Sequence, residues 1–270
     1  MQGIVISQAH MQRRLTRLLR FVATAGLAAT TVVALLGGTL AEKAMAAQSA
    51  SITAKFAPER LGRHTTTTLA FKITASQWLP SPLTAVDFAY PRNLGIATSD
   101  LGTATCPQTA LQERGPGVCP PNSIMGRGTV SVEVPLGPEV VPETASIALV
   151  AGTFHSGGLN LLVAATGTSP VAARIVMPTS LQNGHFHIAV PLVESLPEGP
   201  DVAVVGASVT LGGDLTYYAR RGGNRFAYHP KGALLPPSCP RGGFRFAATF
   251  TFLDGSRASA RATVGCPRRG

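Results

Sequence analysis

The sequence FRFAATFTF, residues 244–252, alternates between two kinds of side chain. Its four phenylalanines and Ala248 share one face of an extended strand, while arginine, threonine and a second alanine take the other face. RASARATV, residues 257–264, alternates in the same way after a short turn. Because successive side chains of a strand point to opposite faces, the two stretches predict a β-hairpin with one buried face.

The buried face also constrains the register of this hairpin. A two-residue turn at Asp254-Gly255 would place Phe252 across from Arg257 and mix the apolar face with the polar one. We therefore predict a three-residue loop or a β-bulge. The predicted pairs set large residues beside small ones: Phe252 with Ala258, Phe250 with Ala260, and Phe246 with Val264.

The same period of two returns in most of the chain from residue 51 onward, as in SITAKF, TTTTLAFKIT, TAVDFAY and TVSVEV. Turn-forming residues separate these stretches, with 29 Gly and 21 Pro in the chain. The best helical candidate is the short TALQERG at 109–115. We predict an all-β fold, a β-sandwich of about a dozen mostly antiparallel strands.

The strands are expected to form one domain over residues 47–270. Two packed sandwiches divided near residues 139–143 are the alternative. Residues 91–128 show no strand pattern and are predicted to be one long loop, tied by its own disulfide.

The N-terminal 46 residues have the layout of a secretory signal peptide. A stretch with four arginines (11–20) precedes an apolar run (21–38), and AMAA follows at 44–47. We predict cleavage after Ala46 and a secreted or cell-envelope location. The alternative is an uncleaved segment that anchors the protein in the membrane.

The charge of the chain is modest once this segment is set aside. The formal net charge is +10, and residues 47–270 keep 18 basic and 12 acidic residues, or +6. These charges are scattered and few aromatics accompany them, which argues against nucleic-acid binding. An anionic envelope polymer or a protein is the expected partner.

Four cysteines, each followed by proline, are predicted to form disulfides, as is usual in exported chains. The local pairing joins Cys106 to Cys119 and Cys239 to Cys266. Their spacing does not fit a zinc site, and no C-x-x-C motif is present.

Catalytic and metal signals are weak, and we predict no catalytic residue, metal site or cofactor. His185 and His187 would share the outward face of a strand. Acidic residues cluster at Glu133–Glu143 and at Glu194–Asp201, where Glu194 and Asp201 are weak candidates. No G-x-S-x-G, H-E-x-x-H or P-loop stands in a suitable context.

Several stretches, including LPSPLTAVDFAYPRNLG, CPPNSIMGRGTV and CPRGGFRFAATFTF, resemble a group of exported actinobacterial β-rich proteins with Cys-Pro motifs. The resemblance covers most of residues 55–267. It implies secretion and a single β-rich unit, and it carries no catalytic residues.

These observations favour an exported, non-enzymatic protein of the cell envelope or the extracellular space, with a structural or binding role. The alternative is a secreted hydrolase of glycans or esters that uses a pair of carboxylates from the two acidic clusters.

Overall fold

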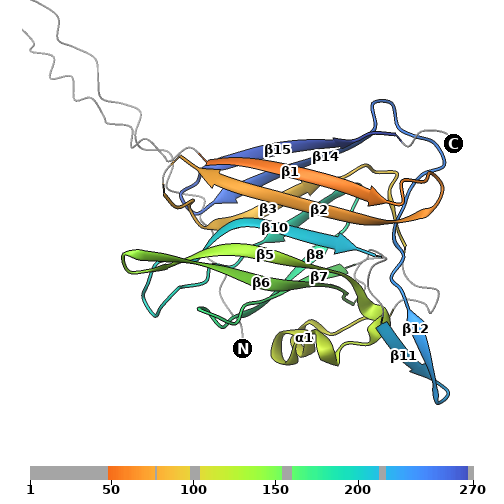
Figure 1. The fold of residues 1–270 in the computed structure, drawn as a ribbon, viewed down its shortest axis with the longest axis horizontal. Helices are drawn as coiled ribbons and strands as arrows, with labels where there is room; N and C mark the ends of the chain where they lie inside the picture. Colours follow the sequence, from red (N-terminus) through yellow and green to blue (C-terminus); the bar gives the residue numbers. More distant parts are fainter. Residues whose placement is uncertain (1–47, 77, 98–103, 154–159, 213–216, 267–270) are drawn as a thin grey trace, which may run out of the picture. The chain divides into compact units, whose positions relative to one another are not determined.

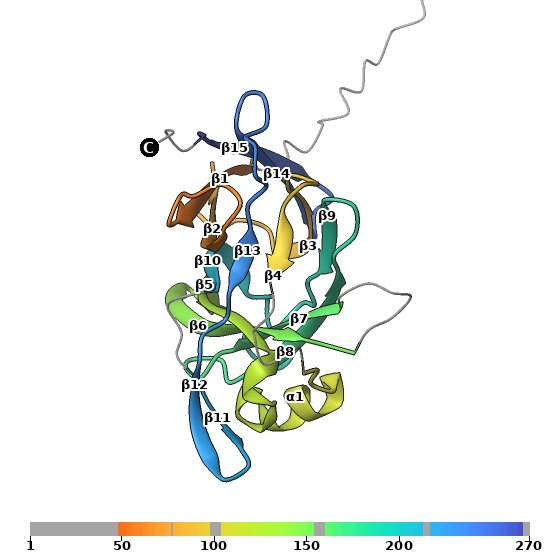
Figure 2. The same ribbon diagram turned by 90° about the vertical axis from the view of Figure 1, so that its right-hand side faces the viewer.

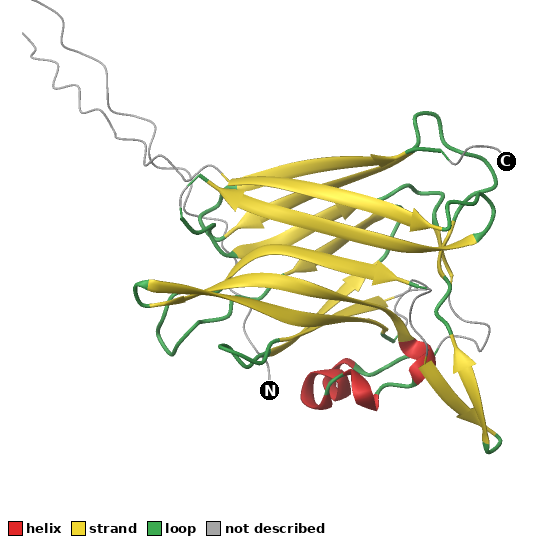
Figure 3. Ribbon diagram, in the orientation of Figure 1, coloured by secondary structure: helices red, strands yellow, loops and turns green. Residues whose placement is uncertain are grey.

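The structure is a computed structural model that describes residues 48–76, 78–97, 104–153, 160–212 and 217–266. The described residues form fifteen β-strands, one α-helix and two short 3-10 helices. Every strand pair among them is antiparallel. The predicted β-sandwich is confirmed (Figures 1 and 3). The expected signal peptide, residues 1–46, lies outside the described residues.

The larger sheet has nine strands in the order β4-β13-β2-β10-β5-β6-β7-β8, and β1 also pairs with β2. Its strands are β1 (Gln48–Ala57), β2 (His64–Ala75), β4 (Gly95–Ala97), β5 (Ile124–Leu136), β6 (Glu139–Ala151), β7 (Asn160–Thr166), β8 (Arg174–Ser180), β10 (Ala203–Leu211) and β13 (Gly232–Leu234).

The smaller sheet has the order β15-β14-β3-β9. Its strands are β3 (Leu83–Ala89), β9 (His185–Ala189), β14 (Phe244–Phe252) and β15 (Arg257–Val264). A separate hairpin consists of β11 (Tyr217–Arg221) and β12 (Asn224–Tyr228) and projects from the two sheets (Figure 1).

The two sheets meet along both of their long edges. At one edge, β1 lies against β15, and Gln48 Nε2 donates a hydrogen bond to Ser256 Oγ at 2.7 Å. At the other edge, Thr179 Oγ1 of β8 donates to the carbonyl oxygen of His187 in β9 at 2.7 Å. Figure 2, which looks along the strands, shows them arranged as a ring with β4 and β13 in front. The two sheets and these edge contacts therefore enclose the space between them.

Residues Lys43–Gly270 form one compact unit. Residues 139–143 lie inside β6, which pairs with β5 from Glu139 to Val150. The larger sheet thus continues across residues 139–143, where the alternative of two packed sandwiches places its division.

The C-terminal hairpin has the predicted faces but a different register. Its phenylalanines are buried, and the small residues of β15 face them. The observed pairs lie two residues away from the predicted ones: Phe250 with Ala258, Phe246 with Ala262, and Phe244 with Val264.

The loop of this hairpin explains the difference. The predicted three-residue loop is confirmed: Phe252 N donates to Ser256 O at 3.1 Å and leaves residues 253–255 between them. Asp254 Oδ1 accepts hydrogen bonds from the backbone N (2.9 Å) and the hydroxyl (2.7 Å) of Ser256, which tightens the turn. The predicted pairing of Phe252 with Ala258 was wrong. It would leave five residues, 253–257, in the loop instead of the three observed. A slip of two residues keeps the same face buried, so alternation alone does not detect it.

The part of the predicted loop between residues 104 and 123 contains more regular structure than expected. It contains α1 (Gln108–Arg114) and the 3-10 helices Pro116–Val118 and Pro121–Ser123, and β5 begins as early as Ile124. Cys106 and Leu111, both fully buried, pack on the outer face of the β6–β7–β8 region. This region is therefore buried on both faces. None of the described helices is long and apolar enough to cross a membrane.

Both predicted disulfides are present, and their pairing is confirmed: Cys106 with Cys119 and Cys239 with Cys266. The first holds the α1 segment in a closed loop. The second joins the residues that flank the C-terminal hairpin. Paired cysteines of this kind are typical of proteins that fold in an oxidising compartment outside the cytoplasm.

Candidate binding site

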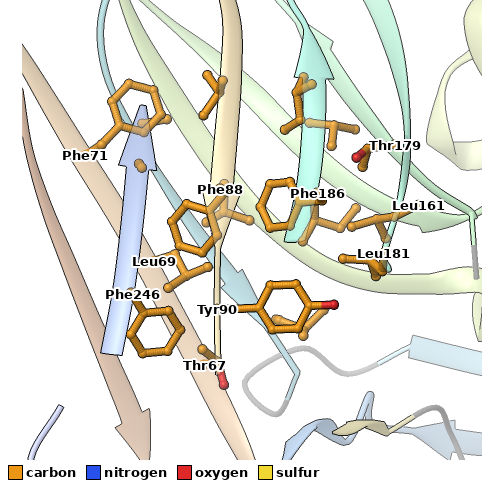
Figure 4. A pocket seen from close by; sticks show the side chains of 18 of the residues that line it. Thr67, Leu69, Phe71, Phe88, Tyr90, Leu161, Thr179, Leu181, Phe186 and Phe246 are labelled. Carbon is orange, nitrogen blue, oxygen red and sulfur yellow. The ribbon is translucent and has the colours of Figure 1, made fainter. Parts of the chain in front are cut away.

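Two apolar cavities lie next to each other between the two sheets. The first has a volume of about 210 Å³ and the second about 200 Å³. Figure 4 shows the first, with aromatic side chains from both sheets around it. Six residues line both cavities, which shows that the cavities adjoin: Phe71, Val86, Val163, Ile188, Ala207 and Val209.

The lining residues show that this space is long and narrow. Along β10, the lining runs from Val204 in the second cavity to Leu211 in the first. At the rise of a β-strand, this stretch is about 20 Å long. Along β5, Met125 lines the first cavity and Val132 lines the second. The cavities therefore extend along the strands rather than across them.

The cavities exist because the two inner faces are packed unevenly. Near β1 and β15 the packing is close: Phe244 is 0% exposed, and its ring meets the Phe56 ring edge-to-face at 5.2 Å between centroids. Toward the centre, inward-facing apolar side chains are only partly buried, although they come from both sheets: Leu69, Phe71, Phe186, Ile188, Val204 and Val209. The exposed part of these side chains faces the cavities rather than a second layer of side chains.

Few polar groups line the first cavity, and no charged side chain is among its described lining residues. Thr179 is satisfied by its bond to the backbone of β9. Burial raises the pKa of the Tyr90 phenol, and a hydrogen bond from the backbone of Gly184 only partly opposes this shift. Tyr90 is therefore a neutral hydroxyl at physiological pH. Thr67 is 5% exposed, and its hydroxyl has no hydrogen-bond partner.

The second cavity has one carboxylate at its margin, that of Glu143 in β6. Glu143 is 7% exposed. Its Oε1 accepts hydrogen bonds from the backbone N–H groups of Thr168 (3.0 Å) and Ser169 (3.2 Å), and its Oε2 accepts one from Val171 (3.2 Å). The side chain thus holds the β7–β8 loop in place.

Replacing Glu143 by glutamine is expected to lower the free energy of unfolding by about 1–3 kcal/mol. Glutamine has a single side-chain oxygen, so at least one of the three backbone donors would face an amide N–H instead. The measurement is urea unfolding followed by circular dichroism. The control is Glu139→Gln on the exposed start of the same strand, with an expected change within about 0.5 kcal/mol. Equal effects of the two changes would contradict this role of Glu143.

The other acidic candidates lie in the loop between β9 and β10. Glu194 and Asp201 are brought together by an isolated antiparallel bridge, and Glu194 Oε2 accepts a hydrogen bond from Glu198 N at 3.2 Å. Neither residue lines the cavities, although Val193 and Val202 beside them line the second one. The structure therefore does not place Glu194 or Asp201 with Glu143 in one cavity.

The two histidines lie on the exposed face of β9, as the alternation predicted. His187 Nδ1 lies 2.7 Å from Asp87 Oδ1 of the adjacent strand, with both side chains more than half exposed. His185 is also exposed. In the part of the chain that the structure describes, no group of three His, Cys, Asp or Glu side chains gathers as a metal ion would require.

No pattern in the sequence identifies the residues that line the cavities. Thr67 belongs to a run of four threonines, and Ala207 is one small residue among many. The available signal was the alternation that turns Leu69 and Phe71 inward. It gives the direction of a side chain but not the distance to the opposite sheet.

The candidate site is thus an apolar space between the sheets that follows a stretch of β10 about 20 Å long, and the residues that line its first cavity include the uncharged hydroxyl residues Thr67, Tyr90 and Thr179. No protein-family model, curated protein or solved structure matches this chain significantly.

Proposed function

We propose that this protein is an exported, non-enzymatic binding protein that holds an apolar ligand between its two sheets. The pair of adjoining apolar cavities carries this proposal. Each is larger than the roughly 150 Å³ apolar cavity that accepts benzene, and together they fall in the usual range of ligand pockets. The two disulfides and the predicted signal peptide support export of the protein from the cytoplasm.

The size of the cavities favours an occupant over an empty core. A cavity left by a large-to-small substitution in a protein core costs about 24 cal/mol per Å³, so a dry and fully closed cavity of about 200 Å³ would cost about 5 kcal/mol. The whole free energy of unfolding of a domain is about 5–15 kcal/mol. An apolar ligand would recover part of this cost because it restores the missing contacts.

The arrangement of the carboxylates supports binding more than hydrolysis. Glu143 is the one carboxylate among the described lining residues, and its two oxygens are occupied by three backbone donors. A hydrolase that uses a pair of carboxylates needs a second one across the site. The expected anionic envelope polymer remains a prediction that rests on the +6 charge of residues 47–270.

Replacing Ala207 by phenylalanine is expected to weaken binding of an apolar ligand by about tenfold or more. Ala207 lines both cavities, so the added ring would occupy the place where they adjoin. The matched control is Ser208→Phe, which adds the same ring on the exposed side of the same strand. The measurement is the fluorescence of N-phenyl-1-naphthylamine, titrated into each of the three proteins.

Binding by the wild type and by Ser208→Phe, with a large loss in Ala207→Phe, would support the proposal. Equal binding by all three proteins, or none by the wild type, would overturn it. Hydrolysis of a nitrophenyl ester that is lost in Glu143→Gln would favour the hydrolase instead.

A further inference from the structure

The hydroxyl of Thr67 is an exception among the threonine hydroxyls at this end of the structure. Thr65, two residues earlier on β2, is 1% exposed, and its Oγ1 donates to the carbonyl oxygen of Pro58 at 2.9 Å. Thr179 donates to the backbone of β9. Thr67 is 5% exposed and lines the first cavity, yet its Oγ1 has no hydrogen-bond partner.

An unpaired buried hydroxyl costs about 1–3 kcal/mol, because it loses its bonds to water without replacement. Valine has nearly the same shape and would avoid this cost. A rotation of about 120° about χ1 carries the hydroxyl of threonine from one staggered well into the well that its methyl occupied. Thr67 can therefore present its hydroxyl to a molecule in the cavity.

The position of Thr67 shows which part of a ligand would meet it. Thr67 pairs with Leu211 of β10, at the end of the first cavity that Leu94 and Ala233 also line, next to β4 and β13. Figure 4 shows Thr67 and Tyr90 among the labelled lining residues. From this end, the apolar space extends along the strands toward the second cavity. A ligand with a polar end and a long apolar chain would match this arrangement.

The charge of the ligand's polar end follows from the lining. The described residues around the first cavity include no lysine, arginine or histidine to pair with an anion, and no carboxylate to pair with a cation. Burial of an unpaired charge there would be costly, whereas an alcohol or an ester carbonyl needs only a hydrogen bond.

We infer that the ligand is an uncharged, oxygen-bearing lipid whose hydroxyl or carbonyl oxygen bonds to Thr67 and whose hydrocarbon chain extends toward the second cavity. This inference rests on the proposed function.

The test compares ligands and variants by displacement of N-phenyl-1-naphthylamine. The ligands are 1-hexadecanol, hexadecane and palmitate, and the variants are Thr67→Val and Thr65→Val. Thr67→Val is expected to weaken binding of hexadecanol by about five- to tenfold and to change binding of hexadecane less than about twofold. Palmitate is expected to bind the wild type more weakly than hexadecanol does.

Thermal unfolding without ligand separates recognition from a structural role. Thr67→Val is expected to unfold at the same temperature as the wild type or higher, because it removes an unpaired buried hydroxyl. Thr65→Val is expected to unfold at a lower temperature, because it removes the hydrogen bond from the Thr65 hydroxyl to the Pro58 carbonyl. It is expected to keep the wild-type preference for hexadecanol over hexadecane, because Thr67 is intact.

Equal effects of Thr67→Val on the two ligands, or a lower unfolding temperature, would overturn the role of Thr67. Binding of palmitate as tight as that of hexadecanol would overturn the preference for an uncharged ligand. Either result leaves the proposed function standing. Failure of the wild type to bind any of the three ligands would instead overturn the proposed function.

Discussion

Replacing Phe244 by alanine is expected to lower the free energy of unfolding by about 3–5 kcal/mol. Phe244 is fully buried, faces Val264 across the C-terminal hairpin and packs edge-to-face on Phe56 at 5.2 Å. Alanine would leave a void, because the rigid neighbouring strands cannot collapse into the vacated space. Urea unfolding followed by circular dichroism would show a lower midpoint with an unchanged slope.

The matched control is Arg245→Ala, at the next position of the same strand with an exposed side chain. The expected change is within about 0.5 kcal/mol. Phe244 does not line either cavity, so Phe244→Ala should keep its affinity for ligand while it remains folded. A loss below about 1 kcal/mol would show that the contact between β1 and β14 does not contribute to the stability as its geometry indicates.

Replacing both Cys106 and Cys119 by alanine is expected to lower the free energy of unfolding by about 3–5 kcal/mol. The disulfide joins residues 13 positions apart, and this loop closure alone accounts for about 3 kcal/mol. Both cysteines also belong to the buried cluster beneath α1, together with Leu111, so their loss would loosen the packing there. The measurement is again urea unfolding under non-reducing conditions.

The paired control is the removal of Cys239 and Cys266. Their sulfurs join residues 27 positions apart, and Cys266 is exposed, so the loss should be close to the loop-closure value of about 3.5 kcal/mol. The α1 cluster lies on the face of the larger sheet opposite the cavities. Removal of the first disulfide should therefore leave ligand affinity intact in the folded fraction, and a large loss of affinity would contradict this separation.

Alternation of side chains predicted most of the strands and the faces that they bury. The period of two fixes the face of Ile52, Phe71 or Phe250, because each residue reverses the direction of the side chain. It does not fix the partner of a strand or a slip by two residues. The register of β14 and β15 depends on the turn closed by Phe252 and Ser256, and the position of β10 between β2 and β5 depends on contacts distant in sequence.

The candidate site could not be predicted from the sequence for a related reason. The hydrophobic pattern identifies Val163, Ile188 and Val209 as inward-facing residues. A fully packed core without a cavity would have the same pattern. A cavity arises from the separation of two sheets, which depends on how their edges meet. The sequence also does not show that the hydroxyl of Thr67 lacks a hydrogen-bond partner. Only the folded structure shows that the hydroxyls of Thr65 and Thr179 have partners and that of Thr67 has none. Glu143 was noted in an acidic cluster, but its role in holding the β7–β8 loop depends on three backbone donors 25 to 28 residues away.

The contact between β1 and β15 has a consequence for the order of folding. Gln48 and Ser256 are 208 residues apart in sequence, so the edge that they join can close only after nearly the whole chain is present. Contacts of such long range slow folding, because the entropy of closing the chain is lost before the contact stabilises it. A chain that emerges N-terminus first would keep the inner face of β1 uncovered until its last hairpin arrives. Completion of the space between the two sheets would thus be among the last events of folding.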